Sequence, residues 1–215
     1  MTRVYYVVAV ILVAAALGAS LVFNPLLPET VPIHWNLHGE IDGYGHKTQA
    51  LLLMPAIMLG MIGLFRMLQW LSPRHFEVDS FRATWLYIMV LLVGFFGYLH
   101  GAILWSARSG TVDPTRTFFG GIFLLFAFLG NVLGRVRRNF WIGVRTPWTL
   151  ASERVWNDTH RLAARLFFGV GLLGAVAVFF GVPFLASFAL LAIIVMVPVV
   201  YSLVLYKRLE RRGEV

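Results

Sequence analysis

The sequence has 215 residues, of which 59% are apolar and only 13% are charged, whereas a soluble domain carries about 25% charged residues. This composition excludes a disordered chain, a coiled coil and a polar nucleic-acid-binding domain, and the absence of Cys excludes a disulfide-stabilised scaffold. The net charge of +8 would suit a nucleic-acid partner, but the basic residues cluster at the ends of long apolar runs, which is typical of membrane proteins.

Long stretches without Asp, Glu, Lys or Arg predict six membrane-spanning helices, and hence an all-α integral membrane protein. About 17–25 apolar residues cross the hydrocarbon core of a bilayer. The first four runs each suit one span, and the fifth suits two spans with a turn at Gly181-Val182-Pro183. The first run is longer than the apolar region of a signal peptide, so we expect a retained helix. The runs cover residues 4–28, 48–65, 83–107, 117–134 and 166–206.

The distribution of basic residues predicts that both chain termini lie in the cytoplasm. In that orientation 15 of the 18 Lys and Arg residues lie inside, and cytoplasmic loops carry such an excess. The same residues would contact anionic headgroups. We therefore expect membrane lipids as partners and no direct contact with nucleic acid.

Polar residues are few within the predicted spans, whereas small residues are frequent. His100 and Asn131 are the main intramembrane polar groups, and Arg66 lies near an inner helix end. Such groups are costly in lipid and often functional, yet for His100 we favour a structural hydrogen bond over a catalytic or proton-relay role. Small residues at helical spacing predict close packing between helices of the same chain. They are Gly94, Gly97, Gly101, Gly130, Gly134, Gly169, Gly171 and Gly174.

The outer loop, residues 24–49, is polar and rich in turn-forming residues. The segment from Val31 to Trp35 is predicted to be extended, because Pro32 disfavours the helical conformation of the residue before it. The turns predict a compact element on the outer mouth of the bundle. Imidazole and carboxylate groups are zinc ligands, so a metal site is one interpretation, and hydrogen bonding within the loop is the other. The residues concerned are His34, His38, Glu40, Asp42 and His46.

The inner loop, residues 131–165, combines three Trp and seven Arg residues with only two acids. Thr146 followed by Pro147 predicts a helix start, and the helix would continue through Trp156 and His160 into the fifth span. An amphipathic helix on the membrane surface explains the Arg and Trp residues together. Alternatively, Arg145 beside a tight turn could bind a phosphate or carboxylate.

Two motifs in these loops resemble a known group of bacterial membrane proteins. The outer loop, with Pro32 to Trp35 followed by Gly39 to Gly45, is similar to the domain called DUF1648, and the inner loop resembles the signature of the SdpI family. This divides the chain into a DUF1648-like region (1–71), a connector with the third helix (72–116) and an SdpI-like region (117–215). The inner residues that carry the resemblance are Gly130, Asn131, Asn139, Gly143, Arg145, Thr146, Pro147, Trp148, Thr149, Leu150, Trp156, Thr159, His160 and Arg161.

The resemblance implies a function that the residue pattern alone does not. The type member of the family protects its producer against a secreted membrane-active toxin peptide, and it holds a transcriptional repressor at the membrane once toxin is present. We therefore hypothesise a non-enzymatic immunity and signalling protein. The outer motif would engage an exported peptide, such as the toxin, or a lipid-like ligand, and the inner motif would hold the cytoplasmic helix ends or a partner such as the repressor. The outer motif comprises His34, Trp35, Gly39, Asp42 and Gly43.

A transporter of lipids or small molecules, or a membrane enzyme with a metal site at His34, His38 and Asp42, is the alternative hypothesis. It predicts a polar cavity that joins His100 or Asn131 to one of the loops. The sequence offers no nucleophile–base pair and no phosphate-binding glycine loop, so we expect neither catalysis nor a cofactor. The sequence does not define the oligomeric state.

Overall fold

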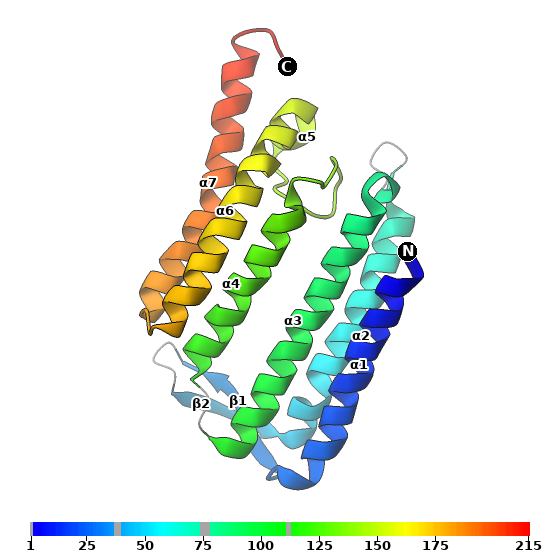
Figure 1. Ribbon diagram of the computed structural model, residues 1–215, viewed down its shortest axis with the longest axis vertical. Coiled ribbons are helices and arrows are strands. Elements are labelled where there is room, and N and C mark those ends of the chain that lie inside the picture. The colour runs from blue at the N-terminus through cyan, green and yellow to red at the C-terminus, as the bar shows by residue number, and fades with distance from the viewer. Residues whose placement is uncertain (1, 37–39, 74–77, 111–112) are drawn as a thin grey trace.

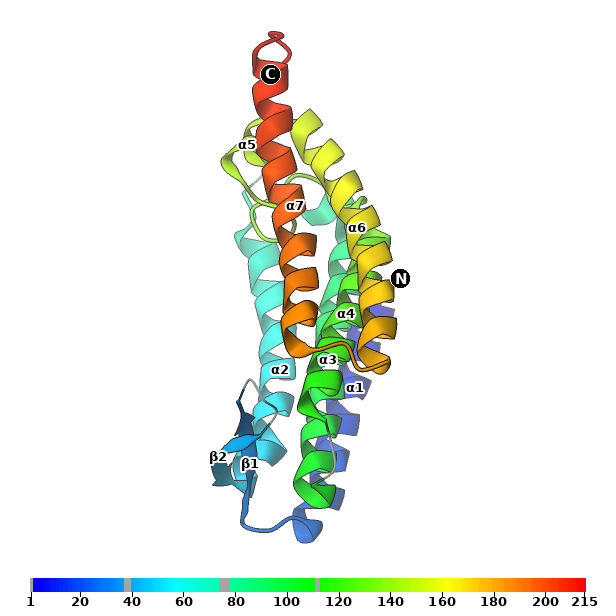
Figure 2. The ribbon, with the colours of Figure 1, turned by 90° about the vertical axis from the view of Figure 1, so that its left-hand side faces the viewer.

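The computed structural model describes residues 2–36, 40–73, 78–110 and 113–215, which form an elongated bundle of helices (Figures 1 and 2). Within these residues, six helices are long and apolar enough to cross a membrane, which confirms the six predicted spans. A two-stranded hairpin lies at one end of the bundle, and a short helix lies near the other end, where the chain also terminates (Figure 1). The two patterned loops therefore lie at opposite ends.

The helices follow the charge-free runs closely and extend them at several ends. The six long helices are α1 (Thr2–Phe23), α2 (Lys47–Leu71), α3 (Arg82–Ser109), α4 (Pro114–Leu133), α6 (Glu153–Phe179) and α7 (Phe184–Glu210). The short elements are the 3-10 helices η1 (Asn24–Leu26) and η3 (Val78–Phe81), the strands β1 (Thr30–Trp35) and β2 (Ile41–His46), and helix α5 (Pro147–Ala151).

The long helices form two groups of three. Helix α3 packs against α1 and α2, while α6 packs against α4 and α7, and a contact between α3 and α4 joins the groups. The first group centres on the fully buried Trp85, whose ring lies 4.7 Å from that of Phe65. The second group has Phe123 and Ile194 in its core. Because lipid tails are as apolar as these side chains, close packing rather than exclusion of water holds such helices together.

Glycines bring α4 and α6 into backbone contact. A Cβ atom added at Gly130 would lie 2.4 Å from a backbone nitrogen of α6, and one added at Gly171 would lie 2.7 Å from a backbone nitrogen of α4. Neither position accommodates a larger residue without separating the helices. The prediction of glycine-mediated packing is thus confirmed at this interface, whereas Gly101 and Gly169 have no neighbour within 4 Å that a Cβ would meet.

The turn between the last two spans lies where the sequence predicted it. Helix α6 ends at Phe179 and α7 begins at Phe184, and Gly181 between them has φ +86°. L-amino acids with a side chain rarely adopt that conformation, so the glycine permits the turn. Pro183 then precedes the first residue of α7.

The inner helix differs from the prediction of one continuous helix into the fifth span. Helix α5 ends after five residues, and Ser152 adopts an extended conformation with φ −132° and ψ 125°. The Ser152 hydroxyl accepts a hydrogen bond from the backbone N–H of Val155 and so caps α6. A serine that caps a new helix competes with continuation of the old one, which is why the prediction was wrong here.

Candidate functional site

The outer loop folds as an antiparallel β-hairpin, which we name the outer hairpin (residues 30–46) after its predicted location. The extended segment predicted from Val31 to Trp35 is confirmed as β1, whereas β2 was not predicted. The strands pair Thr30 with His46 and Val31 with Gly45, and the register is irregular around His34. Val31 is fully buried against the ends of the first three helices, so the hairpin is packed onto the bundle.

One histidine–carboxylate contact links the two strands of the outer hairpin. The Nδ1 atom of His34 lies 2.5 Å from Oδ1 of Asp42, and both side chains are exposed. Gly43 pairs with His34, and a Cβ atom at Gly43 would lie 2.9 Å from the His34 Cβ atom. His34, Asp42 and Gly43 of the outer motif therefore link the two strands through one hydrogen bond and one close approach.

The outer hairpin is tied to the first turn of α2. The Glu29 carboxylate lies 2.8 Å from Nζ of Lys47 and 3.1 Å from Nε2 of His46. The Nδ1 atom of His46 accepts the backbone N–H of Thr48 and caps the helix. The hydrogen bond and charge of Lys47, together with His46, hold the pKa of the Glu29 carboxyl below its ordinary value.

The metal interpretation of the outer loop has limited geometric support. His34 and Asp42 do meet, but His46 is occupied by Glu29 and the helix cap. His38 and Gly39 lie outside the described residues. Within residues 2–36, 40–73, 78–110 and 113–215, no three His, Asp or Glu side chains group as metal ligands.

At the opposite end, Asn139 organises residues 134–146 of the inner loop, the stretch between α4 and α5. Its side chain is fully buried and makes four hydrogen bonds to the backbone. The amide nitrogen donates to the carbonyls of Arg137 (2.8 Å) and Ile142 (3.1 Å), and the amide oxygen accepts the N–H groups of Trp141 (2.7 Å) and Ile142 (2.9 Å). A side chain that satisfies four backbone groups defines a single loop conformation.

His160 holds the next part of the inner loop against α6. Its Nε2 atom accepts the backbone N–H of Val144 at 3.0 Å, and its Nδ1 atom donates to the carbonyl of Trp156 at 2.8 Å. Both bonds require the neutral ring with the proton on Nδ1. Gly143 has φ +112°, and a Cβ atom there would lie 2.3 Å from Nε2, so this glycine allows the loop to approach the ring.

Trp156, one turn before His160 in α6, stacks on that histidine and connects α6 to the residues that follow α4. Its ring stacks on the imidazole with centroids 4.0 Å apart, and its indole N–H donates to the carbonyl of Val136 at 2.8 Å. Both side chains are almost completely buried. The sequence predicted that Trp156 and His160 share one helix face, and the structure confirms it.

A capping box begins α5 and joins it to α7. The Thr146 hydroxyl accepts the N–H of Thr149, and the Thr149 hydroxyl accepts the N–H of Thr146, with Pro147 in the first turn. The Thr146 hydroxyl also lies 3.1 Å from that of Ser202, whose own hydroxyl donates to a carbonyl of α7. The predicted helix start is thus confirmed, while the role of Ser202 was missed.

A tryptophan of the inner loop connects the two helix groups. The indole N–H of Trp141 donates to the Ser72 hydroxyl at 2.7 Å, just beyond the last residue of α2. The Ser72 hydroxyl in turn donates to the carbonyl of Leu68. The sequence did not indicate either residue, because no local pattern relates positions 69 residues apart.

Several other residues of the inner motif are exposed or half-buried. Arg145 donates to the carbonyl of Phe140, and Arg161 pairs with Asp158 within α6. Trp148 is half-buried on α5, whereas Asn131 is exposed near the end of α4. The motif therefore divides into a buried network that shapes the loop and an exposed set that is open to other molecules. The buried polar and aromatic residues are Asn139, Thr146, Thr149, Trp156, Thr159 and His160.

A separate polar cluster lies between α1, α2 and α3, within the first helix group. Nε2 of the buried His100 lies 3.0 Å from the Ser20 hydroxyl and 3.1 Å from the carbonyl of Ala16. The Ser20 hydroxyl also lies 2.6 Å from the carbonyl of Leu51. His100 thus makes the interhelical hydrogen bond that was expected, and Ser20 is the partner that the sequence did not reveal.

The fold defines a multi-pass α-helical membrane protein of the kind found in the plasma membrane, with a folded loop at each end of the bundle. Residues 135–202 match the SdpI/YfhL protein family, and residues 11–59 match a domain of unknown function, DUF1648. The chain is 27% identical over 174 residues to the immunity protein SdpI of Bacillus subtilis (strain 168), and the alignment covers 81% of each chain. No solved structure matches significantly. The resemblance to the SdpI family is therefore confirmed.

Proposed function

We propose that this chain is a membrane immunity protein that protects its cell against a secreted, membrane-active toxin peptide. The observation that carries the proposal is the similarity to an immunity protein over four-fifths of both chains. The two family matches include the whole outer hairpin and most of the inner loop with α5. Both loops that distinguish this chain from an ordinary helical bundle thus fall within the regions of similarity.

An apolar groove beside the outer hairpin is the surface that suits such a peptide. It has a volume of about 500 Å³ and is lined by Ile33 of β1, Leu53 of α2 and Ile103 of α3. A peptide that acts on membranes presents apolar side chains at the lipid boundary. Close packing of those side chains in the groove would hold the peptide on the protein instead of in the bilayer, because packing contacts rather than exclusion of water favour association where lipid tails are the alternative.

Helix α2 provides the route by which occupancy outside would be sensed inside. An ion pair between Lys47, in the first turn of α2, and Glu29, just before β1, holds this end of the helix to the outer hairpin. At the other end, the hydroxyl of Ser72, the residue after the last turn, accepts the indole N–H of Trp141. A ligand shifts a protein only if it binds one arrangement better than another. We propose that toxin favours a shifted position of α2, which alters the inner loop.

The inner loop is where a transcriptional repressor would be held in this scheme. Arg137, Phe140 and Arg145 are exposed on the loop, and the buried network fixes the backbone that carries them. Arginine and aromatic residues are the types enriched at protein interfaces. A repressor with an acidic, partly apolar surface would complement them.

Survival of toxin-treated cells tests the immunity proposal. Cells that lack the Bacillus subtilis immunity protein would express this chain, and they are expected to survive beside toxin-producing cells. Ile33→Ser should reduce survival, whereas Ile41→Ser should not. The two isoleucines are similarly exposed, 43% and 39%, but only Ile33 lines the groove. Killing of cells in which the wild-type chain is present in the membrane would contradict immunity.

The location of the repressor tests the sensing proposal separately. Trp141→Phe removes the bond to Ser72 while the ring remains, so it should preserve survival but prevent toxin-dependent recruitment of a fluorescent repressor to the membrane. Trp148→Phe is the matched control, because Trp148 is also half-buried and makes no such bond to α2 among the described residues. Recruitment that persists in Trp141→Phe would refute transmission through α2.

A further inference from the structure

A groove of about 710 Å³ lies at the end of α2 that is remote from the outer hairpin. Residues of the last turns of α2 form one side of it, and the first residues of η3 form the other. This groove shares no lining residue with the apolar groove beside the hairpin, and its walls are partly apolar and partly polar. Its principal lining residues are Gly63, Arg66, Met67, Trp70, Ser72 and Asp79.

The apolar wall of this groove faces outward from the bundle. Trp70 is 82% exposed and Met67 is 48% exposed, which is unusual for large apolar side chains unless lipid surrounds them. Gly63 lies one turn before Met67 on the helix, and a Cβ atom there would meet nothing within 4 Å. The groove therefore remains open toward the middle of the span.

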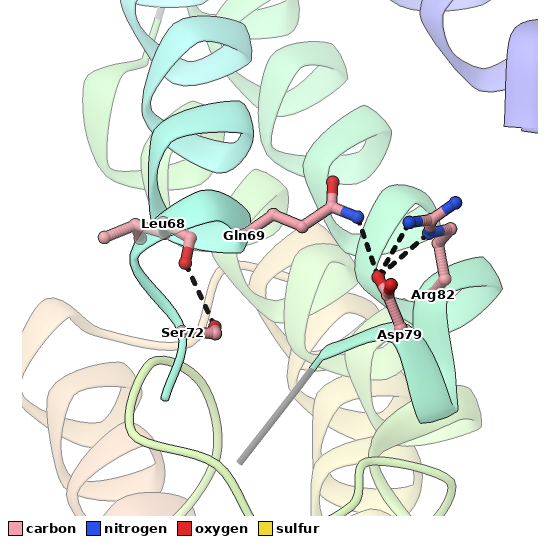
Figure 3. Close-up of polar contacts among 5 residues, drawn as sticks. All are labelled: Leu68, Gln69, Ser72, Asp79 and Arg82. Carbon is pink, nitrogen blue, oxygen red and sulfur yellow. Dashed lines mark hydrogen bonds and ion pairs between the residues drawn. The ribbon is translucent and has the colours of Figure 1, made fainter. Parts of the chain in front are cut away.

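The polar wall is formed by a carboxylate whose charge is already compensated. Asp79 accepts hydrogen bonds from Nε2 of Gln69 at 2.9 Å and from the guanidinium of Arg82 at 2.8 and 3.1 Å, as Figure 3 shows. Arg82 donates through two nitrogens to the same carboxylate oxygen. The wall is thus nearly neutral and presents no net negative charge to an incoming anion.

Arg66 supplies the remaining charge of the groove. It is exposed, and within the described part of the chain no carboxylate lies within ion-pair distance of it. With Asp79 and Arg82 paired, the described lining of the groove carries a net charge close to +1. A planar guanidinium binds phosphate oxygens in a fork geometry.

We propose that this groove binds the headgroup of an anionic phospholipid, with the phosphate on Arg66 and the upper acyl chain along Met67 and Gly63. Trp70 lies on the same helix end, and tryptophan prefers the headgroup level of a bilayer. Simple extension of Arg66 toward the headgroups would explain that residue alone. It would not explain a groove that places together an exposed indole, an open apolar floor and a cation with no carboxylate partner among the described residues.

A bound headgroup would also contact the junction between α2 and the inner loop. Ser72 lines the groove, accepts the indole N–H of Trp141 and donates to the carbonyl of Leu68; Figure 3 shows the latter contact. Lipid composition would therefore influence one of the contacts that join the two helix groups. This inference does not depend on the immunity proposal, because it concerns the resident membrane and not a toxin.

Native mass spectrometry of the full chain tests the proposal. The protein would be reconstituted in bilayers of equal parts phosphatidylglycerol and phosphatidylcholine with matched acyl chains, and the retained lipids counted. We expect phosphatidylglycerol to be enriched about fivefold, the factor that corresponds to one basic residue near an anionic surface. Arg66→Gln should abolish the enrichment, and Arg66→Lys should preserve most of it.

Arg165→Gln is the matched control, since Arg165 is an exposed arginine on a spanning helix outside the groove. It should leave the enrichment unchanged. Equal retention of the two lipids by the wild-type protein would overturn the proposal. An equal loss in Arg66→Gln and Arg165→Gln would also overturn it, because general charge would then account for the selectivity. Protein isolated from cells could also retain a bound polypeptide that is lost in Arg66→Gln. In that case the occupant of the groove is a polypeptide, and the lipid assignment is wrong.

Discussion

Replacement of Gly143 by Ala tests the buried inner network most sharply. The glycine has φ +112°, so a residue with a side chain would be strained there by about 1–3 kcal/mol. The new methyl group would also start 2.3 Å from Nε2 of His160 and would force the ring away from the N–H of Val144. Loss of that hydrogen bond adds about 0.5–1.5 kcal/mol. The free energy of unfolding should therefore fall by about 2–4 kcal/mol.

Thermal unfolding of the purified protein in detergent, followed by intrinsic tryptophan fluorescence, measures this effect. A loss of 1 kcal/mol corresponds to about 2–4 °C for a chain of this length, so the apparent Tm should fall by roughly 5–15 °C. Gly213→Ala is the control, because Gly213 also has a positive φ, +67°, but no atom lies within 4 Å of an added Cβ. It should cost only the backbone strain.

A double-mutant cycle separates the two causes. In a His160→Ala background the steric conflict is gone, so Gly143→Ala should cost only its backbone strain, and the coupling should be at least about 1 kcal/mol. If Gly143→Ala destabilises the protein no more than Gly213→Ala, or destabilises it equally in the His160→Ala background, the contact between this loop and the ring does not have the energetic role assigned to it.

Three further predictions concern helix packing, intramembrane hydrogen bonds and pH. Gly171→Ala should destabilise the fold by about 2 kcal/mol or more, because the added methyl group meets the α4 backbone. Gly169→Ala should be neutral or slightly stabilising, because its methyl group meets no atom within 4 Å. Equal changes in Tm for the two variants would contradict this. Ser20→Ala should lower the free energy of unfolding by about 0.6–1.7 kcal/mol, because it removes an interhelical hydrogen bond. Ser187→Ala should leave it unchanged, because the buried Ser187 hydroxyl lacks a partner among the described residues. A larger loss of stability at Ser187 than at Ser20 would refute the assignment. Because the pKa of Glu29 is lowered in the folded hairpin, its ionised carboxylate stabilises the hairpin at pH values above the ordinary pKa of a glutamate. This contribution is lost as the pH falls through the lowered pKa. The protection of the hairpin amides against hydrogen exchange, relative to their intrinsic rates, should therefore fall in acid. Glu29→Gln should remove that dependence, and an unchanged dependence would exclude Glu29 as its cause.

The parts of the structure that the sequence predicted are those set by local chemistry. Charge-free runs gave the spans because a charge within lipid is costly. Gly181 indicated the final turn, Thr146 and Pro147 indicated a helix start, and the residues around Pro32 indicated an extended segment. Each of these features depends on a residue and its immediate neighbours.

The parts that were missed depend on contacts between distant residues. Strand β2 contains Asp42, Gly43 and Gly45, which have low strand propensity, and it forms because β1 supplies its partner. The link from Trp141 to Ser72 joins different helix groups, and no periodicity relates the two positions. The orientation in the membrane and the roles of the loop residues toward toxin, repressor or metal stay predictions.

The placement of the outer hairpin and the inner loop on opposite faces of the membrane underlies the proposed immunity and sensing. The chain contains no Cys, so Tyr44→Cys in the hairpin and Arg137→Cys in the inner loop each introduce a single thiol at an exposed position. In intact spheroplasts a membrane-impermeant maleimide should label position 44 at once and position 137 only after permeabilisation. Labelling of both positions from outside, or of position 137 alone, would contradict this arrangement.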